Sequence, residues 1–224
     1  MQHVAIIPAR AGSKSVIDKN LQEINGKSLV SIAASLTKKA TFMDMVYLST
    51  DIESLSAAHY STNYFKFIKR PKALATDQAT MADVVLDLIK SQLISINAYI
   101  WLIQPTSPFR CLHDFFEIKN LLQKYEPMSV ISVVDVGPNH PNRMYTVKEA
   151  ELLPLRHNNF DNKQDLINVY LRNGCFYVVK CEEFLKHKTF YLKTCISYLM
   201  PKERSVNIDD EHDLMWARMM AKYQ

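Results

Sequence analysis

Short apolar runs and helical repeats alternate along most of this 224-residue chain. The apolar runs have the composition of buried strands and predict strands at His3–Ile7, Met45–Thr50, Tyr64–Lys69, Tyr99–Ile103, Ser129–Val136 and Cys175–Lys180. Apolar residues at helical spacing predict helices at Leu29–Lys38, Ile52–Tyr60, Met81–Leu93, Leu112–Tyr125 and Glu211–Lys222. A short extended piece is expected at Leu21–Ile24, followed by a turn at Asn25-Gly26. The alternation predicts an α/β fold with a mostly parallel sheet and helices on both of its faces.

The alternation stops at Gly137 and resumes after Asn168. The residues in between are polar, rich in asparagine and interrupted by prolines. A stretch of this length inside a compact domain is usually functional or inserted. One interpretation is a solvated surface loop, but apolar residues such as Leu152, Leu153 and Leu155 favour an arm that makes contacts. We therefore predict a single domain, residues 1–224, that carries residues 137–168 as an inserted arm.

The first predicted strand leads into a loop that carries three cations, Arg10, Lys14 and Lys19. Ligands of open α/β sheets bind at the carboxyl ends of strands. There the cations could neutralise a polyphosphate, while Gly12 lets backbone N–H groups approach its oxygens. The sequence excludes a Walker loop, because Ser13 rather than glycine precedes Lys14 and no glycine lies five positions before Ser13. It also excludes a dinucleotide fingerprint, because Gly12 stands alone. A merely solvated basic loop is less favoured, because the loop directly follows a strand of the buried type.

Polar motifs also follow two later strands. Arg70 ends the third predicted strand, where its planar guanidinium suits a base edge or a phosphate. The structural alternative for Arg70 is a surface ion pair with Asp77. The segment QPTSPFR, residues 104–110, follows the most apolar strand, and its two prolines hold Thr106 and Ser107 in a rigid loop.

A last group of polar residues lies near the end of the chain. Asn207 and Asp209 alternate in an extended segment, which points both side chains to the same face. Asp210, Glu211 and Asp213 enter the terminal helix, where acids in the first turn are explained by capping and by the helix dipole. The same structural explanation, a helix N-cap, is preferred for Asp51 after the second strand.

Composition narrows the classes of function. The formal net charge is +4 and the chain has no long basic run, which disfavours nucleic-acid binding and suits an anionic small substrate. The four cysteines match no zinc spacing, and a chain of this size does not need disulfides, so free thiols in the cytoplasm are expected. The opening does not have the pattern of a signal peptide, and no apolar stretch approaches the roughly 20 residues of a membrane span.

Five of these segments resemble, in the same order, the motifs of one known family, the CMP-sugar synthetases, which are cytidylyltransferases that activate acidic sugars. The segments are IIPARAGSK with the following Lys19 and Asn20, RPKALATD, QPTSPFR, QDLINVYLRNG and SVNIDD. The chain departs from the family pattern at Ser15, Ile17, Ile167 and Asn207, where glycine, proline, proline and aspartate are usual. The first two changes alter the stiffness of the loop more than its charge, and the last replaces one metal ligand of the family by an amide.

The resemblance implies a Rossmann-like nucleotidyltransferase that transfers CMP from CTP to a nonulosonic acid of the sialic, legionaminic or pseudaminic type. The residues that it implies for catalysis are Arg10, Lys14, Lys19 and Asp209. Those implied for the nucleotide are Ala9, Arg10, Gly12, Ser13, Asn20, Arg70 and Thr80. Those implied for the sugar are Gln104, Thr106, Ser107, Gln164, Tyr170, Asn173, Phe190 and Tyr191. Mg²⁺ would be held by Asp209 and Asn207.

The resemblance also implies that the arm makes a homodimer, in a cytoplasmic enzyme of surface polysaccharide biosynthesis. Two alternatives stay open. A ketodeoxyoctonate cytidylyltransferase would use the same chemistry, although the QDL segment and the pair Phe190-Tyr191 favour a nine-carbon sugar. A non-catalytic homologue that binds a sugar nucleotide is motivated by Ser15, Ile17 and Asn207.

Overall fold

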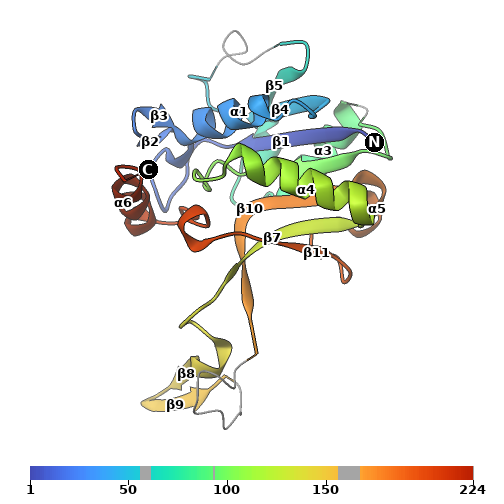
Figure 1. Ribbon diagram of the computed structural model, residues 1–224. Coiled ribbons are helices and arrows are strands. Elements are labelled where there is room, and N and C mark those ends of the chain that lie inside the picture. The colour runs from blue at the N-terminus through green and yellow to red at the C-terminus, as the bar shows by residue number, and fades with distance from the viewer. Residues whose placement is uncertain (56–61, 93, 156–166, 224) are drawn as a thin grey trace.

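The computed structural model describes residues 1–55, 62–92, 94–155 and 167–223. Its centre is a seven-stranded sheet with the strand order β11-β7-β10-β6-β1-β4-β5 (Figure 1). The strands are β1 His3–Ala9, β4 Met45–Thr50, β5 Phe65–Lys69, β6 Tyr99–Leu102, β7 Ser129–Asp135, β10 Tyr170–Lys180 and β11 Ile196–Leu199. Neighbouring strands run parallel except on both sides of β10, which is antiparallel to β6 and β7. The predicted α/β fold with a mostly parallel sheet is therefore confirmed.

Helices cover both faces of this sheet, as the strand pattern predicted. They are α1 Leu29–Lys39, α3 Met81–Ser91, α4 Leu112–Tyr125, α5 Cys181–His187 and α6 Glu211–Met220. Along β1, Ala5 and Ile7 are buried in the apolar cluster of α1 and α4, whereas Val4 and Ile6 are buried in the cluster of α3 and α5. Successive strand residues point to opposite faces, so a strand covered on both sides is apolar throughout. A third, smaller cluster lies under α6.

The segment that follows the β1 loop differs from the sequence prediction in one detail. Lys19–Leu21 forms a 3-10 turn, and the extended piece is confined to β2 Glu23–Ile24, which pairs with β3 Lys27–Ser28. The predicted turn at Asn25-Gly26 is confirmed, with φ of 48° and 71° at the two residues. Two positive φ values in a row are the signature of the tight turns that close hairpins.

Two further differences concern later elements. The predicted helix at Ile52–Tyr60 lies partly outside the described residues, and its described part, residues 52–55, forms a turn and a bend. The elements α5 and β11 were not predicted, since each has too few residues to display a clear apolar period. Among the described residues, none of the helices combines the length and the apolar content that crossing a membrane would need.

Beyond the sheet, β7 and β10 lead to a hairpin that stands away from the body of the protein (Figure 1). The hairpin consists of β8 Tyr145–Lys148 and β9 Glu151–Pro154. All residues of both strands are exposed, including Val147, Leu152 and Leu153. The described part of residues 137–168 therefore has regular structure and projects, while its contact with a second copy stays a prediction.

Candidate active site

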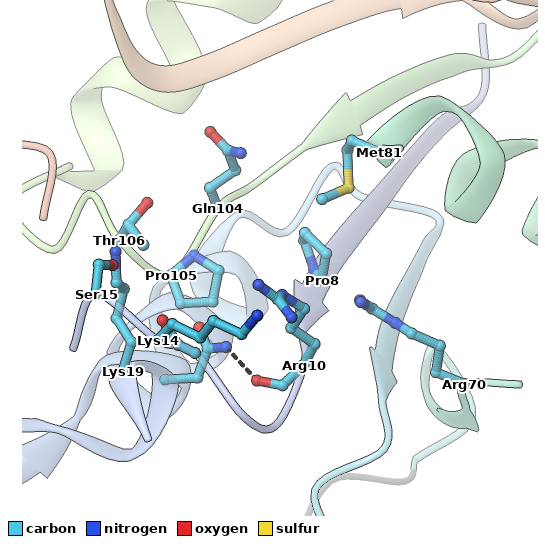
Figure 2. A pocket seen from close by; sticks show the side chains of 12 residues that line it. Pro8, Arg10, Lys14, Ser15, Lys19, Arg70, Met81, Gln104, Pro105 and Thr106 are labelled. Carbon is cyan, nitrogen blue, oxygen red and sulfur yellow. Dashed lines mark hydrogen bonds between the residues drawn. The ribbon is translucent and has the colours of Figure 1, made fainter. Parts of the chain in front are cut away.

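A cavity of about 400 Å³ opens where β1, β5 and β6 end (Figure 2). Its lining comes from segments far apart in the sequence: Pro8, Arg10, Ser13, Lys14, Ser15, Lys19, Asn20, Arg70, Met81, Gln104, Pro105 and Thr106. Parallel strands bring their carboxyl ends to one edge of a sheet, which is where ligands of this architecture bind. The structure thus gathers at one cavity most of the residues expected for the nucleotide and two of those expected for the sugar.

Two cations of the β1 loop share one carboxylate. Arg10 Nη2 lies 2.7 Å from Asp77 Oδ1, and Lys14 Nζ lies 2.7 Å from Asp77 Oδ2. Hydrogen bonds from Lys14 and from Arg10 are the main causes that lower the pKa of the Asp77 carboxyl. The sequence offered Asp77 only as a partner of Arg70, so its pairing with the loop cations is a finding of the structure.

Arg70 is held at the end of β5, with 4% of its surface exposed. Its Nη2 donates to the carbonyl oxygen of Ser49 at 2.9 Å, and its Nε donates to Ser49 Oγ at 3.4 Å. Burial lowers the pKa of Arg70, the nearby Asp51 opposes this shift, and the charge of Arg10 adds to it. Figure 2 shows the guanidinium extending from the end of β5 toward Arg10. A cation fixed in this way is preorganised for an anionic or planar ligand.

The far side of the β1 loop is tied to the last motif of the chain. Lys19 Nζ donates to the carbonyl oxygens of Ile208 at 3.0 Å and of Asp209 at 2.8 Å. Asn20 Nδ2 donates to the carbonyl oxygen of Arg10 at 2.9 Å, the bond drawn in Figure 2. Lys19 and Asn20 therefore shape the loop as well as line the cavity.

Two more features set the course of the β1 loop. Gly12 has a φ of +65°, in the left-handed region that glycine enters at little cost. The N–H of Ala11 donates to Asp51 Oδ1 at 2.9 Å. In the part of the chain that the structure describes, Asp51 therefore ties the end of β4 to the loop after β1, in place of the expected helix cap.

On the opposite wall, the loop after β6 holds the amide of Asn207. Thr106 Oγ1 and Ser107 Oγ donate to Asn207 Oδ1 at 2.8 and 3.4 Å, and Asn207 Nδ2 donates to Asp209 Oδ2 at 2.8 Å. Asn207 and Asp209 thus meet on one face, as their alternation predicted. A Cβ at Gly174 would lie 3.1 Å from Asn207 Oδ1, so the glycine keeps β10 close to this amide.

A fully buried arginine, Arg110, fixes the loop after β6 from behind. Its Nη1 donates to the carbonyl oxygen of Cys175 at 2.7 Å, and its Nη2 donates to that of Gln104 at 2.6 Å. Burial lowers the pKa of Arg110 to about 10. The loop after β6 is therefore bound to β10. The sequence missed this role, although the arginine at the end of QPTSPFR was visible as part of the motif.

The remaining residues expected for the sugar are scattered. Asn173 is buried, accepts a hydrogen bond from Ser132 Oγ at 2.6 Å and donates one to Ser205 Oγ at 2.9 Å. Phe190 is buried in the apolar cluster of α3 and α5, whereas Tyr191 is 54% exposed and lies under the guanidinium of Arg172, whose Cζ is 4.0 Å from the ring centroid. Tyr170 is exposed at the start of β10, and Gln164 lies outside the described residues.

Three residues expected for the nucleotide, Thr80, Ala9 and Gly12, sit beside the cavity rather than in its lining. Thr80 is the N-cap of α3, where its Oγ1 accepts a hydrogen bond from the N–H of Asp83 at 3.2 Å and the Asp83 carboxylate accepts one from the N–H of Thr80 at 3.0 Å. Ala9 is buried as the last residue of β1. Met81, the first residue of α3, reaches the cavity in place of Thr80.

The donor set near Asn207 suits a metal ion with few protein ligands. The amide oxygen of Asn207 is already bonded to Thr106, which leaves Asp209 as the carboxylate of this face. The described residues contain no group of three or more His, Cys, Asp or Glu that could hold a metal ion by itself. Mg²⁺ in nucleotide sites is commonly held by one or two carboxylates and completed by phosphates and waters, so the residues present fit this ion.

The cytidylyltransferase family model matches residues 4–196. The chain belongs to this family. The matched stretch contains the β1 loop, Arg70 and the loop after β6, and all the residues that line the cavity lie within it. The resemblance to cytidylyltransferases that was drawn from the motifs is confirmed.

Several relatives of this chain are enzymes named for acidic sugars. It is 29% identical to an N-acylneuraminate cytidylyltransferase of Streptococcus agalactiae over 96% of this chain and 52% of the relative, and 30% identical to one of Escherichia coli over 94% and 50%. It is 25% identical to a CMP-N,N'-diacetyllegionaminic acid synthase of Legionella pneumophila over 97% and 94%. The chain spans about half the length of the first two relatives and nearly all of the third.

Solved structures add the fold. The structure of a CMP:2-keto-3-deoxy-manno-octonic acid synthetase complexed with CTP matches with a TM-score of 0.72 at 12% identity, over 100% of both chains. A 2-C-methyl-D-erythritol 4-phosphate cytidylyltransferase of Francisella tularensis matches with a TM-score of 0.70 at 12% identity, over 98% of this chain and 100% of that one. At such identities the likeness concerns the fold, which is that of nucleotidyltransferases.

Proposed function

We propose that this protein transfers CMP from CTP to the anomeric hydroxyl of a nonulosonic acid and releases pyrophosphate. The observation that carries the proposal is the cavity at which the cations Arg10, Lys14, Lys19 and Arg70 face the polar side chains of Gln104 and Thr106. Cations suit the phosphates of a nucleotide, and amide and hydroxyl groups suit a sugar. The names of three relatives, two N-acylneuraminate cytidylyltransferases and a CMP-N,N'-diacetyllegionaminic acid synthase, support a nine-carbon acidic sugar as the acceptor.

In the proposed reaction the hydroxyl oxygen of the sugar attacks the α-phosphorus of CTP. The bond from that phosphorus to the bridging oxygen of pyrophosphate breaks, the electron pair leaves with pyrophosphate, and the proton of the hydroxyl passes to solvent water. Phosphoryl-type transfer leaves little covalent work to the protein, so positioning and neutralisation of charge dominate. Arg10, Lys14 and Lys19 would neutralise the triphosphate and the departing pyrophosphate, and Arg70 would bind the nucleotide from the end of β5.

The proposal includes Mg²⁺, held by Asp209 and by phosphate oxygens of the nucleotide. When bound, the ion would offset negative charge between phosphate oxygens. Asn207 would act mainly on Asp209, because its N–H already donates to that carboxylate at 2.8 Å. In this proposal Thr106 orients the amide, since its hydroxyl donates to the amide oxygen and leaves the N–H toward Asp209.

We also propose that the protein is a homodimer whose arm, residues 137–168, contacts the partner. Support comes from the exposed apolar side chains of the arm: Met144, Tyr145, Val147, Leu152, Leu153 and Leu155. A solvated hairpin gains nothing from such side chains, whereas a contact between copies would bury them.

A substrate panel tests the proposal. Release of pyrophosphate from CTP would be measured with N-acetylneuraminate, legionaminate, pseudaminate and ketodeoxyoctonate. We expect release with one or more of the first three. Release with ketodeoxyoctonate alone would establish the alternative enzyme, whose class is that of the CTP-bound structural neighbour. Binding of CTP without release for any of the four sugars would support the non-catalytic alternative.

A further inference from the structure

Two of the cations that line the cavity already have an anion between them. Arg10 and Lys14 each lie 2.7 Å from an oxygen of Asp77, and the carboxylate offers Oδ1 to one and Oδ2 to the other. A phosphate group would bridge two cations in the same way, through two of its anionic oxygens. Asp77 comes from the segment between the 3-10 turn Lys72–Leu74 and α3, so it reaches the β1 loop from a different part of the chain.

The two ion pairs are exposed enough to be displaced. The exposed fractions of the side chains are 32% for Arg10, 83% for Lys14 and 42% for Asp77. Ion pairs at such exposure are weak and are screened by salt. A polyphosphate carries more charge and more acceptor oxygens than one carboxylate, so it can take both cations away from Asp77.

We propose that Asp77 is an internal counter-ion that competes with the polyphosphate of the nucleotide for Arg10 and Lys14. The inference rests on the proposed function, because it takes CTP as the ligand. While the cavity holds no nucleotide, Asp77 offsets part of the positive charge of Arg10 and Lys14. CTP displaces it on binding, and Asp77 returns to the cations as pyrophosphate leaves. The competition lowers the affinity for CTP and for pyrophosphate, and it thereby favours release of the inorganic product.

Calorimetric titration of CTP, pyrophosphate and CMP into the Asp77→Asn variant tests this role. The substitution keeps the size of the side chain and removes the competing charge. We expect the Kd of CTP and of pyrophosphate to fall about 3- to 10-fold, the scale of losing weak exposed ion pairs. The Kd of CMP, which lacks the two outer phosphates, should stay within about 2-fold, since weak exposed pairs act only on groups that reach them. In turnover the KM for CTP should fall with that Kd.

Two further variants separate competition from other effects. Asp18→Asn removes a negative charge from the same loop, where the side chain of Asp18 is exposed and makes no capping hydrogen bond to the 3-10 turn that follows. It should leave the Kd of pyrophosphate within about 2-fold, because no ion pair of the loop cations is lost. Asp77→Glu keeps a carboxylate and should return the affinities toward wild type.

The inference is overturned if Asp77→Asn binds CTP and pyrophosphate with unchanged or weaker affinity. Equal tightening by Asp18→Asn, or equal tightening of CMP, would also overturn it, because a general change of charge would then explain the result. These titrations need no sugar. An enzyme that fails the substrate panel can therefore still support the role of Asp77, and an active enzyme can still refute it.

Discussion

At the scale of single residues, Arg10 is the cation with the clearest predicted effect on the reaction. It lines the cavity, and its guanidinium pairs with the partly exposed carboxylate of Asp77. Charge builds up on the leaving pyrophosphate in the transition state, so Arg10→Ala should lower kcat/KM for CTP by about 100-fold or more. Initial rates with saturating sugar would measure this loss. Lys193→Ala, at an exposed cation outside the cavity lining, is the control, and near wild-type turnover of Arg10→Ala would contradict the role.

A second residue-scale prediction concerns the metal. Asp209→Ala should cost far more activity than Asn207→Ala, because magnesium prefers an anionic oxygen to an amide. Asn207→Asp should lower the magnesium concentration for half-maximal rate, since it adds a negative ligand on the same face. Magnesium titrations of the initial rate compare the three variants. Unchanged activity and magnesium dependence in Asp209→Ala would mean that the ion binds elsewhere.

Residue types at strand ends could be predicted from the sequence, whereas their partners could not. Arg10, Lys14 and Arg70 each follow an apolar run, and parallel strands carry such residues to one edge. The pairing of Asp77 with the loop cations, and of Arg110 with two backbone carbonyls, depends on where side chains lie in space. A pattern along one chain contains no such distances, so these contacts became visible only in the structure.

At the scale of elements, the position of Thr80 at the start of α3 raises the question whether it caps the helix or binds the nucleotide. The sequence offered it as a nucleotide ligand, and the structure shows it in a reciprocal cap with Asp83. Thr80→Ala should therefore lower the free energy of unfolding by about 1 kcal/mol, the usual loss for a capping side chain. Urea denaturation measures this change, with CTP titration as the companion experiment. A large loss of CTP affinity at unchanged stability would make Thr80 a nucleotide ligand instead.

Elements with a clear apolar run or period were predictable even when short, as the four-residue β6 was, and elements without such a pattern were not. α4 was predicted with its observed bounds. Apolar residues recur at helical spacing over its whole length, which is about the length of sequence needed to recognise a helical period. β10 was predicted from Cys175 but begins at Tyr170. Its first residues are exposed at the base of the arm, so they lack the apolar run that marks a buried strand.

At the scale of the whole molecule, the arm leads to a prediction about assembly. The protein should be a dimer at micromolar concentration, and the paired change Leu152→Glu with Leu153→Lys should give a monomer with reduced activity. Charged side chains would have to be buried at the contact, which is costly without partners. Sedimentation velocity measures the assembly, with Ile96→Lys as a control at an exposed apolar residue outside the arm. A monomeric wild-type protein would contradict the proposed role of the arm as a dimer contact.

The bonds from Lys19 to the backbone near Asp209 have a consequence for biosynthesis. The two residues stand 190 positions apart, so the first loop of the chain is fastened by one of its last segments. Contacts between such distant positions form late, because a long stretch of chain must be closed before they can contribute. A nascent chain on the ribosome therefore holds an unfastened loop until Ile208 and Asp209 have left the ribosome. Capture of nucleotide should appear only after that point, whereas the strands around β1 can assemble earlier.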